Sequence, residues 1–397
     1  MTQAASLSTF ALDGTCSALI VWLMVRWARL RDNRIPIAAA CVLALDLQNK
    51  WLVIVVVCGL VAGFAVTGPR ALFSNRAWWI AGTLAMLTGL PGLYWQATHG
   101  WPQWAMGAAI RAEQQLATGG PAGLLGQQFV QAGVLGTVLA VGGIWGFLRS
   151  AALRPYRFVL VAGVVVTAFV FLTGTRPYYT AALLPALYAA GAVVLGSWDS
   201  KVVRRLLPGL GVISLVIAVA VVLLWPLPAS ALRQPSDSSA QVHTRMRLYG
   251  TSGWPELTAA VTHAYRKLPS ETRDKAVIVT DTYWQAAALD NFGVDLPPVY
   301  SPNRGYAYFG TPPETSGPVL YIGPDSRKTV LRNHFRETST IEAADEPLGF
   351  PGVSRFVTVS LCTGRSESWS EIWPALQTLA LDMGFAAGSA SFSKESK

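Results

Sequence analysis

Long apolar runs separated by short polar breaks fill the first part of the chain, to about residue 228. The hydrocarbon core of a bilayer, ~30 Å thick, needs about 20 mostly apolar residues per helix. The pattern therefore predicts about eight transmembrane helices: Leu12–Ala28, Pro36–Asn49, Trp51–Thr67, Ala77–Trp95, Gln127–Leu148, Phe158–Gly174, Tyr178–Gly196 and Leu206–Leu227. The second run is short and carries Asp46, so that helix is expected to be tilted, re-entrant or half-buried behind the others.

The pattern changes after residue 230, where apolar runs become short and polar residues frequent. Runs typical of buried strands occur at Ala276–Thr280, Val319–Ile322 and Phe356–Leu361, and helices are expected at Pro255–Leu268 and Trp284–Phe292. This alternation indicates a small α/β domain. We therefore predict a transmembrane helical domain over 1–230, a Ser-, Pro- and Ala-rich linker over 231–241, a soluble α/β domain over 242–385 and a disordered tail over 386–397.

Composition agrees with a membrane protein. Apolar residues make up 52% of the 397 residues and charged residues only 13%, about half the charged share of a typical soluble protein. The four cysteines form no recognisable framework, since three lie in apolar runs, and we expect no structural disulfide.

The net charge of +9 is explained by the breaks between the apolar runs and does not indicate nucleic-acid binding. Arg and Lys gather in four of these breaks, at residues 26–34, 70–76, 149–157 and 201–205. With eight crossings, all four clusters fall on one side, the cytoplasmic side by the positive-inside rule. The loop Gln96–Gly126 and the C-terminal domain would then be extracytoplasmic, on a multi-pass protein of the plasma membrane.

Polar residues at the outer ends of the predicted helices are the candidates for chemistry, because an ionisable group in hydrocarbon is costly and usually functional. The candidates are Asp13, Asp46, Lys50, Arg176, Tyr178 and Tyr179. Cations at this boundary suit a lipid-linked phosphate, and a carboxylate suits a general base or a metal ligand.

Structural roles are the alternative for each candidate. Asp46 and Lys50, four residues apart, would form an ion pair on one helix face. Arg176 would be an interfacial arginine that extends to the membrane surface. Asp13 would be a helix N-terminal cap.

Two aromatic segments have similar alternatives. The segment His99–Trp104 fits an amphipathic loop on the membrane better than a catalytic element. In the soluble domain, Tyr300, Tyr306, Tyr308 and Phe309 suit core or loop packing, although tyrosines beside Asn303 and Arg304 also suit carbohydrate stacking.

Five segments, in order, give the chain a resemblance to a known family. They are STFALDGTCSALIVWL (Ser8–Leu23), LALDLQNKWL (Leu43–Leu52), LPGLYWQATHGWP (Leu90–Pro102), GTRPYYTAALLPAL (Gly174–Leu187) and, in the C-terminal part, TDTYWQAAALDNFG with LPPVYSPNRGYAYFG and WSEIWP. The chain thus resembles bacterial members of glycosyltransferase family 39, related to protein O-mannosyltransferases and to the lipid A aminoarabinose transferase.

The resemblance implies a C-type fold, a helical membrane bundle with an extracytoplasmic domain, and a polyprenyl-phosphate-linked sugar as donor. The sugar would pass with inversion to an extracytoplasmic lipid, glycan or protein, with membrane lipids as further partners. Asp13 would be a catalytic carboxylate that serves the acceptor side, or would hold a divalent metal. Lys50, Arg176 and Tyr179 would bind the donor phosphate, supported by Asp46 and Tyr178.

The principal catalytic acid of that family lies in its first extracytoplasmic loop, upstream of the segment that Asp13 matches. The resemblance therefore implies that the corresponding N-terminal helices and loop are missing here, and that this chain alone is inactive or nearly so.

Two other function classes compete with the enzyme. The first is a non-catalytic, membrane-anchored protein whose C-terminal domain binds a glycan or a partner. The second is a secondary transporter, which the lack of an internal repeat disfavours. The sequence has no phosphate-binding glycine loop, no metal-ligand spacing of His and Cys and no nucleophile elbow.

Overall fold

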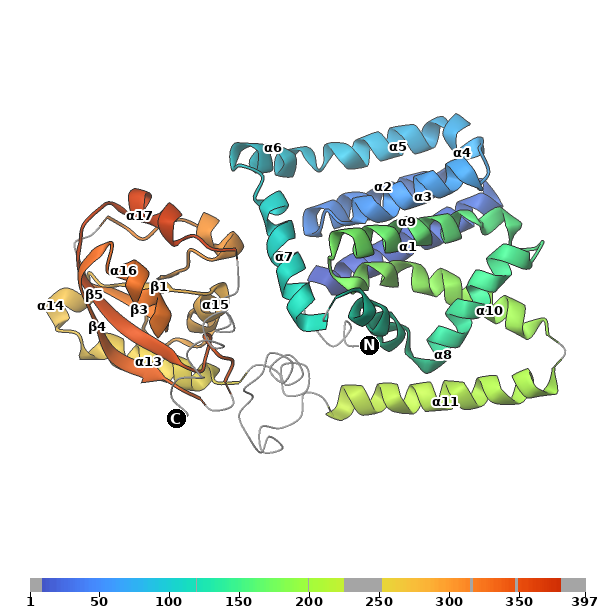
Figure 1. Ribbon diagram of the computed structural model, residues 1–397. Helices are drawn as coiled ribbons and strands as arrows, with labels where there is room; N and C mark the ends of the chain where they lie inside the picture. The colour runs from blue at the N-terminus through green and yellow to red at the C-terminus, as the bar shows by residue number, and fades with distance from the viewer. Residues whose placement is uncertain are drawn as a thin grey trace. The chain divides into compact units, whose positions relative to one another are not determined.

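The chain divides into two compact units, Met1–Leu224 (unit 1) and Trp225–Lys397 (unit 2). The computed structural model describes residues 9–118, 120–198, 200–224, 252–314, 317–346 and 349–379 (Figure 1). The predicted linker 231–241 and the predicted tail 386–397 lie outside the described residues, as do the last three residues of the predicted eighth membrane helix.

Unit 1 is built of helices, and each predicted membrane helix corresponds to one or two of them (Figure 1). The helices are α1 (Thr9–Leu30), α2 (Arg34–Asn49), α3 (Val53–Val66), α4 (Ala71–Ser74), α5 (Arg76–Leu87), α6 (Leu90–Thr98), α7 (Pro102–Thr118), α8 (Pro121–Arg149), η1 (Arg154–Tyr156), α9 (Phe158–Thr173), η2 (Pro177–Leu183), α10 (Leu184–Gly196) and α11 (Lys201–Leu224).

Five stretches of described helix are long and apolar enough to cross a membrane: Thr9–Leu30, Ala122–Arg149, Arg154–Thr173, Pro177–Gly196 and Lys201–Val221. The helix α3 is apolar but has only 14 residues, about 21 Å at 1.5 Å per residue. The predicted fourth helix is interrupted between α5 and α6. Unit 1 is therefore compatible with a multi-pass membrane protein, with fewer full-length crossing helices than the eight that the apolar runs predict.

The predicted loop Gln96–Gly126 is largely helical, which corrects the sequence-based expectation. It contains the end of α6, all of α7 and the start of α8. The α7 sequence, PQWAMGAAIRAEQQLAT, mixes polar and small apolar residues, so it gives no continuous apolar run. Trp104 on α7 is 88% exposed, and Trp101 just before it is half exposed.

The turns that carry the basic clusters lie at one end of unit 1, at the right in Figure 1. Asn75 Nδ2 donates to Asn33 Oδ1 across 2.8 Å, which joins the first two of these turns. Arg157 donates to the carbonyl oxygens of Phe147 and Leu148 across 2.6 Å, which satisfies the C-terminus of α8. These contacts hold the turns with basic clusters in place at that end of unit 1.

Close helix packing in unit 1 depends on glycine. A Cβ at Gly191 of α10 would lie 1.9 Å from the carbonyl oxygen of Leu139 on α8. The helix α8 is itself broken at Gly133, which has φ 71° and ψ 177°. Two residues beyond the break, the backbone N–H of Leu135 donates to Ser214 Oγ on α11 across 3.1 Å. The break therefore provides a backbone donor that attaches α11 to α8.

Unit 2 is a five-stranded mixed sheet of order β2-β1-β3-β5-β4 with helices on both faces (Figure 1). Its elements are α13 (Trp254–Lys267), α14 (Ser270–Arg273), β1 (Val277–Thr280), α15 (Tyr283–Phe292), β2 (Val299–Tyr300), η4 (Arg304–Tyr308), β3 (Val319–Pro324), η5 (Asp325–Arg327), α16 (Lys328–Leu331), β4 (Phe335–Ala344), β5 (Val357–Arg365) and α17 (Trp369–Leu376).

The strands β2, β1 and β3 are parallel, whereas β5 pairs antiparallel with β3 and β4. One face of the sheet packs on α13 and α15, through side chains such as Ile278 and Leu257. The other face packs on α17, through Val279 and Trp373. The five elements that the sequence predicts in unit 2 are all present, and β2 and β4 are additional edge strands.

Candidate functional site

Lys50 is the centre of a polar cluster at the end of unit 1 opposite the basic turns. The helix α2 ends at Asn49, and Lys50 follows it with an extended backbone (φ −159°, ψ 127°). Its Nζ donates to the hydroxyl of Tyr178 across 2.7 Å. The same Nζ lies 4.7 Å from the ring centre of Tyr178 and 5.1 Å from that of Tyr179. Two aromatic faces of η2 thus support the ammonium group by cation–π attraction.

Two buried carboxylates accompany this cation. Asp13 on α1 is 5% exposed and Asp46 on α2 is fully buried. Asp13 interacts electrostatically with Lys50, and Asp46 interacts with both. Asn49 Nδ2 donates to Asp46 Oδ1 across 3.2 Å and to the backbone oxygen of Thr9 across 3.0 Å, which joins α2 to the start of α1. The Oδ2 atom of Asp46 is buried and has no hydrogen-bond partner among the described residues.

Two of the structural alternatives for these residues do not hold. Asp13 lies inside α1, whose described residues begin at Thr9, so it is not a helix N-terminal cap. Asp46 and Lys50 do not share a helix face, because Lys50 lies beyond the end of α2 and its ammonium group is bonded to Tyr178. The ion pairs of the described residues include none between Asp46 and Lys50.

Arg176 has a partner that the sequence did not indicate. Its guanidinium lies 2.7 Å from Glu113 Oε2, and it donates to Gln114 Oε1 across 3.4 Å. Both partners are on α7. A second arginine on that helix, Arg111, donates to the backbone oxygen of Thr173 across 2.8 Å. Polar contacts therefore hold α7 against the segment between α9 and η2, and Arg176 is not simply an exposed interfacial arginine.

Glu113 is not among the predicted site residues, because the sequence predicts a loop over its segment. It is the first carboxylate after Asp46 along the chain. That isolated charge between two apolar stretches is the signal that could have identified it.

The 3₁₀ segment η2 positions the two tyrosines and is held by glutamines of α8. Gln128 Nε2 donates to the backbone oxygen of Pro177 across 3.2 Å. Gln131 Nε2 donates to Thr180 Oγ1 across 3.3 Å, and Thr180 Oγ1 also bonds to Gln128. This network fixes η2 between α8 and α1, which presents Tyr178 toward Lys50 and also toward Phe10, whose ring centre is 5.1 Å away.

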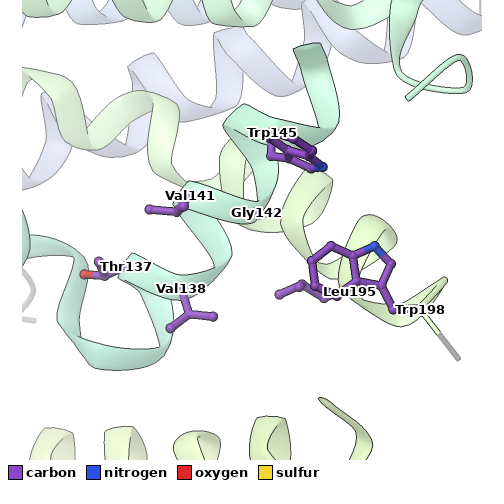
Figure 2. Close-up of a pocket in the computed structure, with 7 residues that line it drawn as sticks. All are labelled: Thr137, Val138, Val141, Gly142, Trp145, Leu195 and Trp198. Carbon is purple, nitrogen blue, oxygen red and sulfur yellow. The ribbon is translucent and has the colours of Figure 1, made fainter. Parts of the chain in front are cut away.

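An apolar groove of about 520 Å³ lies farther along α8 (Figure 2). Figure 2 shows its wall formed by two helices, with Thr137 and Val138 at one end and Trp145 and Trp198 at the other. The complete lining is Thr137, Val138, Val141, Gly142, Trp145, Leu195 and Trp198. The hydroxyl of Thr137 donates to the backbone oxygen of Gly133 across 2.7 Å, so even this residue presents little polar surface. A second cavity, beside Arg26, Arg29 and Tyr156, lies at the basic end and away from Lys50.

The residues present do not form a metal site by themselves. Asp13 and Asp46 provide two carboxylates, and no group of three or more His, Cys, Asp or Glu side chains arranged to hold a metal occurs among the described residues. A magnesium ion held by only two carboxylates takes its other ligands from phosphate and water. Asp13, with Asp46 beside it, would hold such an ion, and the steps proposed below are those of the protein's own side chains.

Unit 2 has a buried polar cluster where β1 and β3 end. Asp281 follows β1 and is 2% exposed. Its Oδ1 accepts from Tyr321 Oη across 2.7 Å and lies 2.6 Å from Arg327 Nε. Burial, and after it the Asp281 charge, raises the pKa of Tyr321 well above its usual range. Because these groups satisfy one another, the cluster stabilises adjacent strand ends, and we assign it no catalytic role.

The structure thus defines a chain with a helical unit that contains five membrane-length apolar helices and a small mixed-sheet unit. Comparison of the chain with protein-family models, with curated proteins and with solved structures yields no match. A functional assignment therefore depends on the polar cluster around Lys50 and on the sequence motifs that form it.

Proposed function

We propose that this protein is a membrane glycosyltransferase of the family 39 type, which transfers a sugar from a polyprenyl-phosphate donor to an extracytoplasmic acceptor with inversion. The observation that carries this proposal is the position of Lys50. Its ammonium group donates a hydrogen bond to Tyr178, makes cation–π contacts with two tyrosine rings and lies beside two buried carboxylates. A cation and an acid together at one boundary of an apolar helical unit match the needs of a lipid phosphate and a reacting hydroxyl.

Lys50 is suited to the donor phosphate because its ammonium group is not committed to a carboxylate. Its direct contacts are a neutral hydroxyl and two aromatic rings. A phosphate oxygen would replace the Tyr178 hydroxyl as the acceptor, and its negative charge would add ionic attraction to a hydrogen bond whose donor is already charged. The Tyr179 ring, which is 8% exposed, would form an apolar wall beside that phosphate.

Arg176 is the second phosphate ligand in this proposal, and Glu113 competes with the phosphate for it. The ion pair between them has its guanidinium 32% exposed and its carboxylate 12% exposed. A donor phosphate would have to take over the guanidinium from Glu113, and α7 would move when it did. Glu113 is therefore a positioning residue that sets how readily the site accepts an anion.

Asp13 is the proposed general base. The acceptor hydroxyl oxygen would attack the anomeric carbon of the sugar while its proton passes to the Asp13 carboxylate. The bond from that carbon to the phosphate oxygen breaks, and its electron pair leaves with the polyprenyl phosphate. Lys50 would stabilise the phosphate charge that appears, and Asp46 would stabilise the cation in its position. Attack from the face opposite the phosphate inverts the anomeric configuration.

The groove along α8 supports a lipid-linked donor. Gln131, which contacts η2, lies six residues before Thr137 at the start of the groove, on the other side of the break at Gly133. Its apolar lining suits a hydrocarbon chain. The polyprenyl chain of a donor with its phosphate at Lys50 would occupy this groove.

The test is transfer of radiolabelled sugar from polyprenyl-phosphate donors in membranes that contain the chain, either as it stands or in a version extended upstream. We expect transfer that Asp13→Asn reduces by about 10²–10⁴-fold, the usual contribution of a general base. The control is Asp32→Asn, which changes an exposed carboxylate at the basic end and should leave the rate unchanged.

Absence of transfer by either version across a panel of donors and acceptors, with both versions folded, would contradict the proposal. That result would favour the alternative of a non-catalytic membrane anchor with a glycan- or partner-binding unit.

A further inference from the structure

Unit 2 has an exposed apolar surface that is concentrated in one place. Five large apolar side chains are exposed on its described residues, and four of them lie within residues 292–309. These four, which we name the aromatic tip, are Phe292 (59% exposed), Val294 (62%), Tyr308 (37%) and Phe309 (82%). Single exposed apolar residues are common on soluble domains, but a group of them marks an interaction site.

Contacts between the two segments join these residues into one patch. Phe292 is the last residue of α15 and Val294 lies two residues beyond it, whereas Tyr308 ends η4 and Phe309 follows it. The hydroxyl of Tyr306 in η4 bonds to Asp290 on the last turn of α15. The ring of Phe309 packs edge-on against that of Tyr306, with their centres 5.2 Å apart. The end of α15 and η4 are therefore neighbours in the fold.

The polar residues beside the tip are directed into the fold. Asn303 is fully buried, accepts from the backbone N–H of Tyr283 across 3.3 Å and donates to the backbone oxygen of Thr378 across 3.1 Å. Arg304 Nε donates to the backbone oxygen of Leu379 across 2.9 Å. Carbohydrate recognition would use these groups to read sugar hydroxyls. Their internal bonds leave a tip that presents aromatic and aliphatic surface, which suits lipid.

The chain itself keeps this surface near a bilayer. Helix α11 is long and apolar enough to cross a membrane, and only residues 225–251 separate its end from Ser252. A stretch of about 27 residues spans at most about 95 Å. If α11 crosses a membrane, this tether holds unit 2 at a high effective concentration beside it, which favours binding even by a small apolar patch.

We propose that the aromatic tip inserts into the headgroup region of the bilayer that α11 crosses. Phe309 and Val294 would reach the boundary between headgroups and acyl chains, as interfacial apolar side chains do. This inference depends on the membrane placement of unit 1 and is independent of the proposed transferase activity.

The test measures the depth of spin labels in the full chain in nanodiscs of phosphatidylcholine and phosphatidylglycerol, whose two faces are both open to reagents. Cys41 and Cys58 are exposed and are first replaced by Ala, whereas Cys16 and Cys362 are buried. Labels are placed by Phe309→Cys and, as a second tip position, Val294→Cys. The aqueous control is Glu337→Cys on β4, at the opposite edge of the sheet from β2.

We expect labels at 309 and 294 to collide more with oxygen and less with a water-soluble nickel chelate than the label at 337. A label at Val216→Cys on α11, 61% exposed, tests the membrane placement separately. Chelate access at 309 and 294 equal to that at 337, with 216 protected, would overturn the inference. If, in addition, an added oligosaccharide lowered chelate access at 309 and 294, the membrane inference would be replaced by glycan binding at the tip. Chelate access at 216 would remove the membrane placement on which it depends.

Discussion

At the scale of single residues, the environment of Lys50 is the most informative feature of the chain. An ammonium group on a flexible stem normally extends toward water. Here the ammonium group makes cation–π contacts with two tyrosine rings of η2. It also interacts electrostatically with buried carboxylates on α1 and α2. The buried Asp46 Oδ2 atom, which lacks a hydrogen-bond partner among the described residues, costs stability. A fold retains such a cost most readily where it serves a ligand.

Glu113→Gln tests whether Arg176 takes part in anion binding. The substitution removes the carboxylate charge and retains a hydrogen-bond acceptor, so the guanidinium becomes available to a phosphate. A partly exposed ion pair contributes up to about 1 kcal/mol, so we expect polyprenyl phosphate to bind up to about fivefold more tightly. Equilibrium binding to the purified chain in nanodiscs measures this.

Arg176→Ala should have the opposite effect and weaken binding. If neither substitution changes the affinity, the ion pair only fastens α7, and Arg176 does not contact the donor.

The sequence indicates some of the candidate site residues clearly and others not at all. Asp13, Asp46 and Lys50 stand out because they interrupt apolar runs, where charge is costly. The pairing of Lys50 with Tyr178, 128 positions away, could not be predicted, because it depends on where η2 packs. Glu113 was missed because its segment has no apolar run and was predicted to be a loop, and its contact with Arg176, 63 positions away, depends on how α7 packs.

At the scale of elements, the α8–α10 interface should be sensitive to one methyl group. Gly191→Ala would place a Cβ against the backbone oxygen of Leu139, and a backbone atom cannot move aside cheaply. We expect this overpacking to lower the stability of unit 1 by about 1–3 kcal/mol, seen as a lower thermal unfolding midpoint.

Gly196→Ala is the matched control, because a Cβ at the end of the same helix meets nothing within 4 Å. It should leave the midpoint unchanged or raise it slightly. Equal behaviour of the two variants would mean that α8 and α10 do not pack as closely as described.

The sequence predicted elements well where one pattern dominates. The strands β1, β3 and β5 are buried and apolar, and α13 and α15 have clear helical patterns, so each was found within a few residues. The strand β4 (FRETSTIEAA) was missed because it is an edge strand with mostly polar side chains, which protect sheet edges from aggregation. Apolar runs also predicted continuous helices where the structure has breaks, such as Gly133 in α8, since hydropathy does not report backbone torsion angles.

At the scale of the whole molecule, unit 1 has two chemically different ends. The four basic turns lie together at one end (Figure 1), and the first and third of them contribute Arg26 and Tyr156 to one cavity. The Lys50 cluster lies at the other end. By the positive-inside rule this polarity would place the cluster on the extracytoplasmic side, where a lipid-linked sugar donor and an extracytoplasmic acceptor would meet.

The most direct test of this account compares polyprenyl phosphate binding by Lys50→Ala and Lys201→Ala in nanodiscs. Both substitutions remove one lysine charge from unit 1, the second from an exposed site at the basic end of α11. Loss of a charged hydrogen bond costs about 1.5–3 kcal/mol, so Lys50→Ala should weaken binding about 10–150-fold, whereas Lys201→Ala should bind as the wild type does. Equal affinity of the wild type and Lys50→Ala would mean that Lys50 does not bind the donor phosphate.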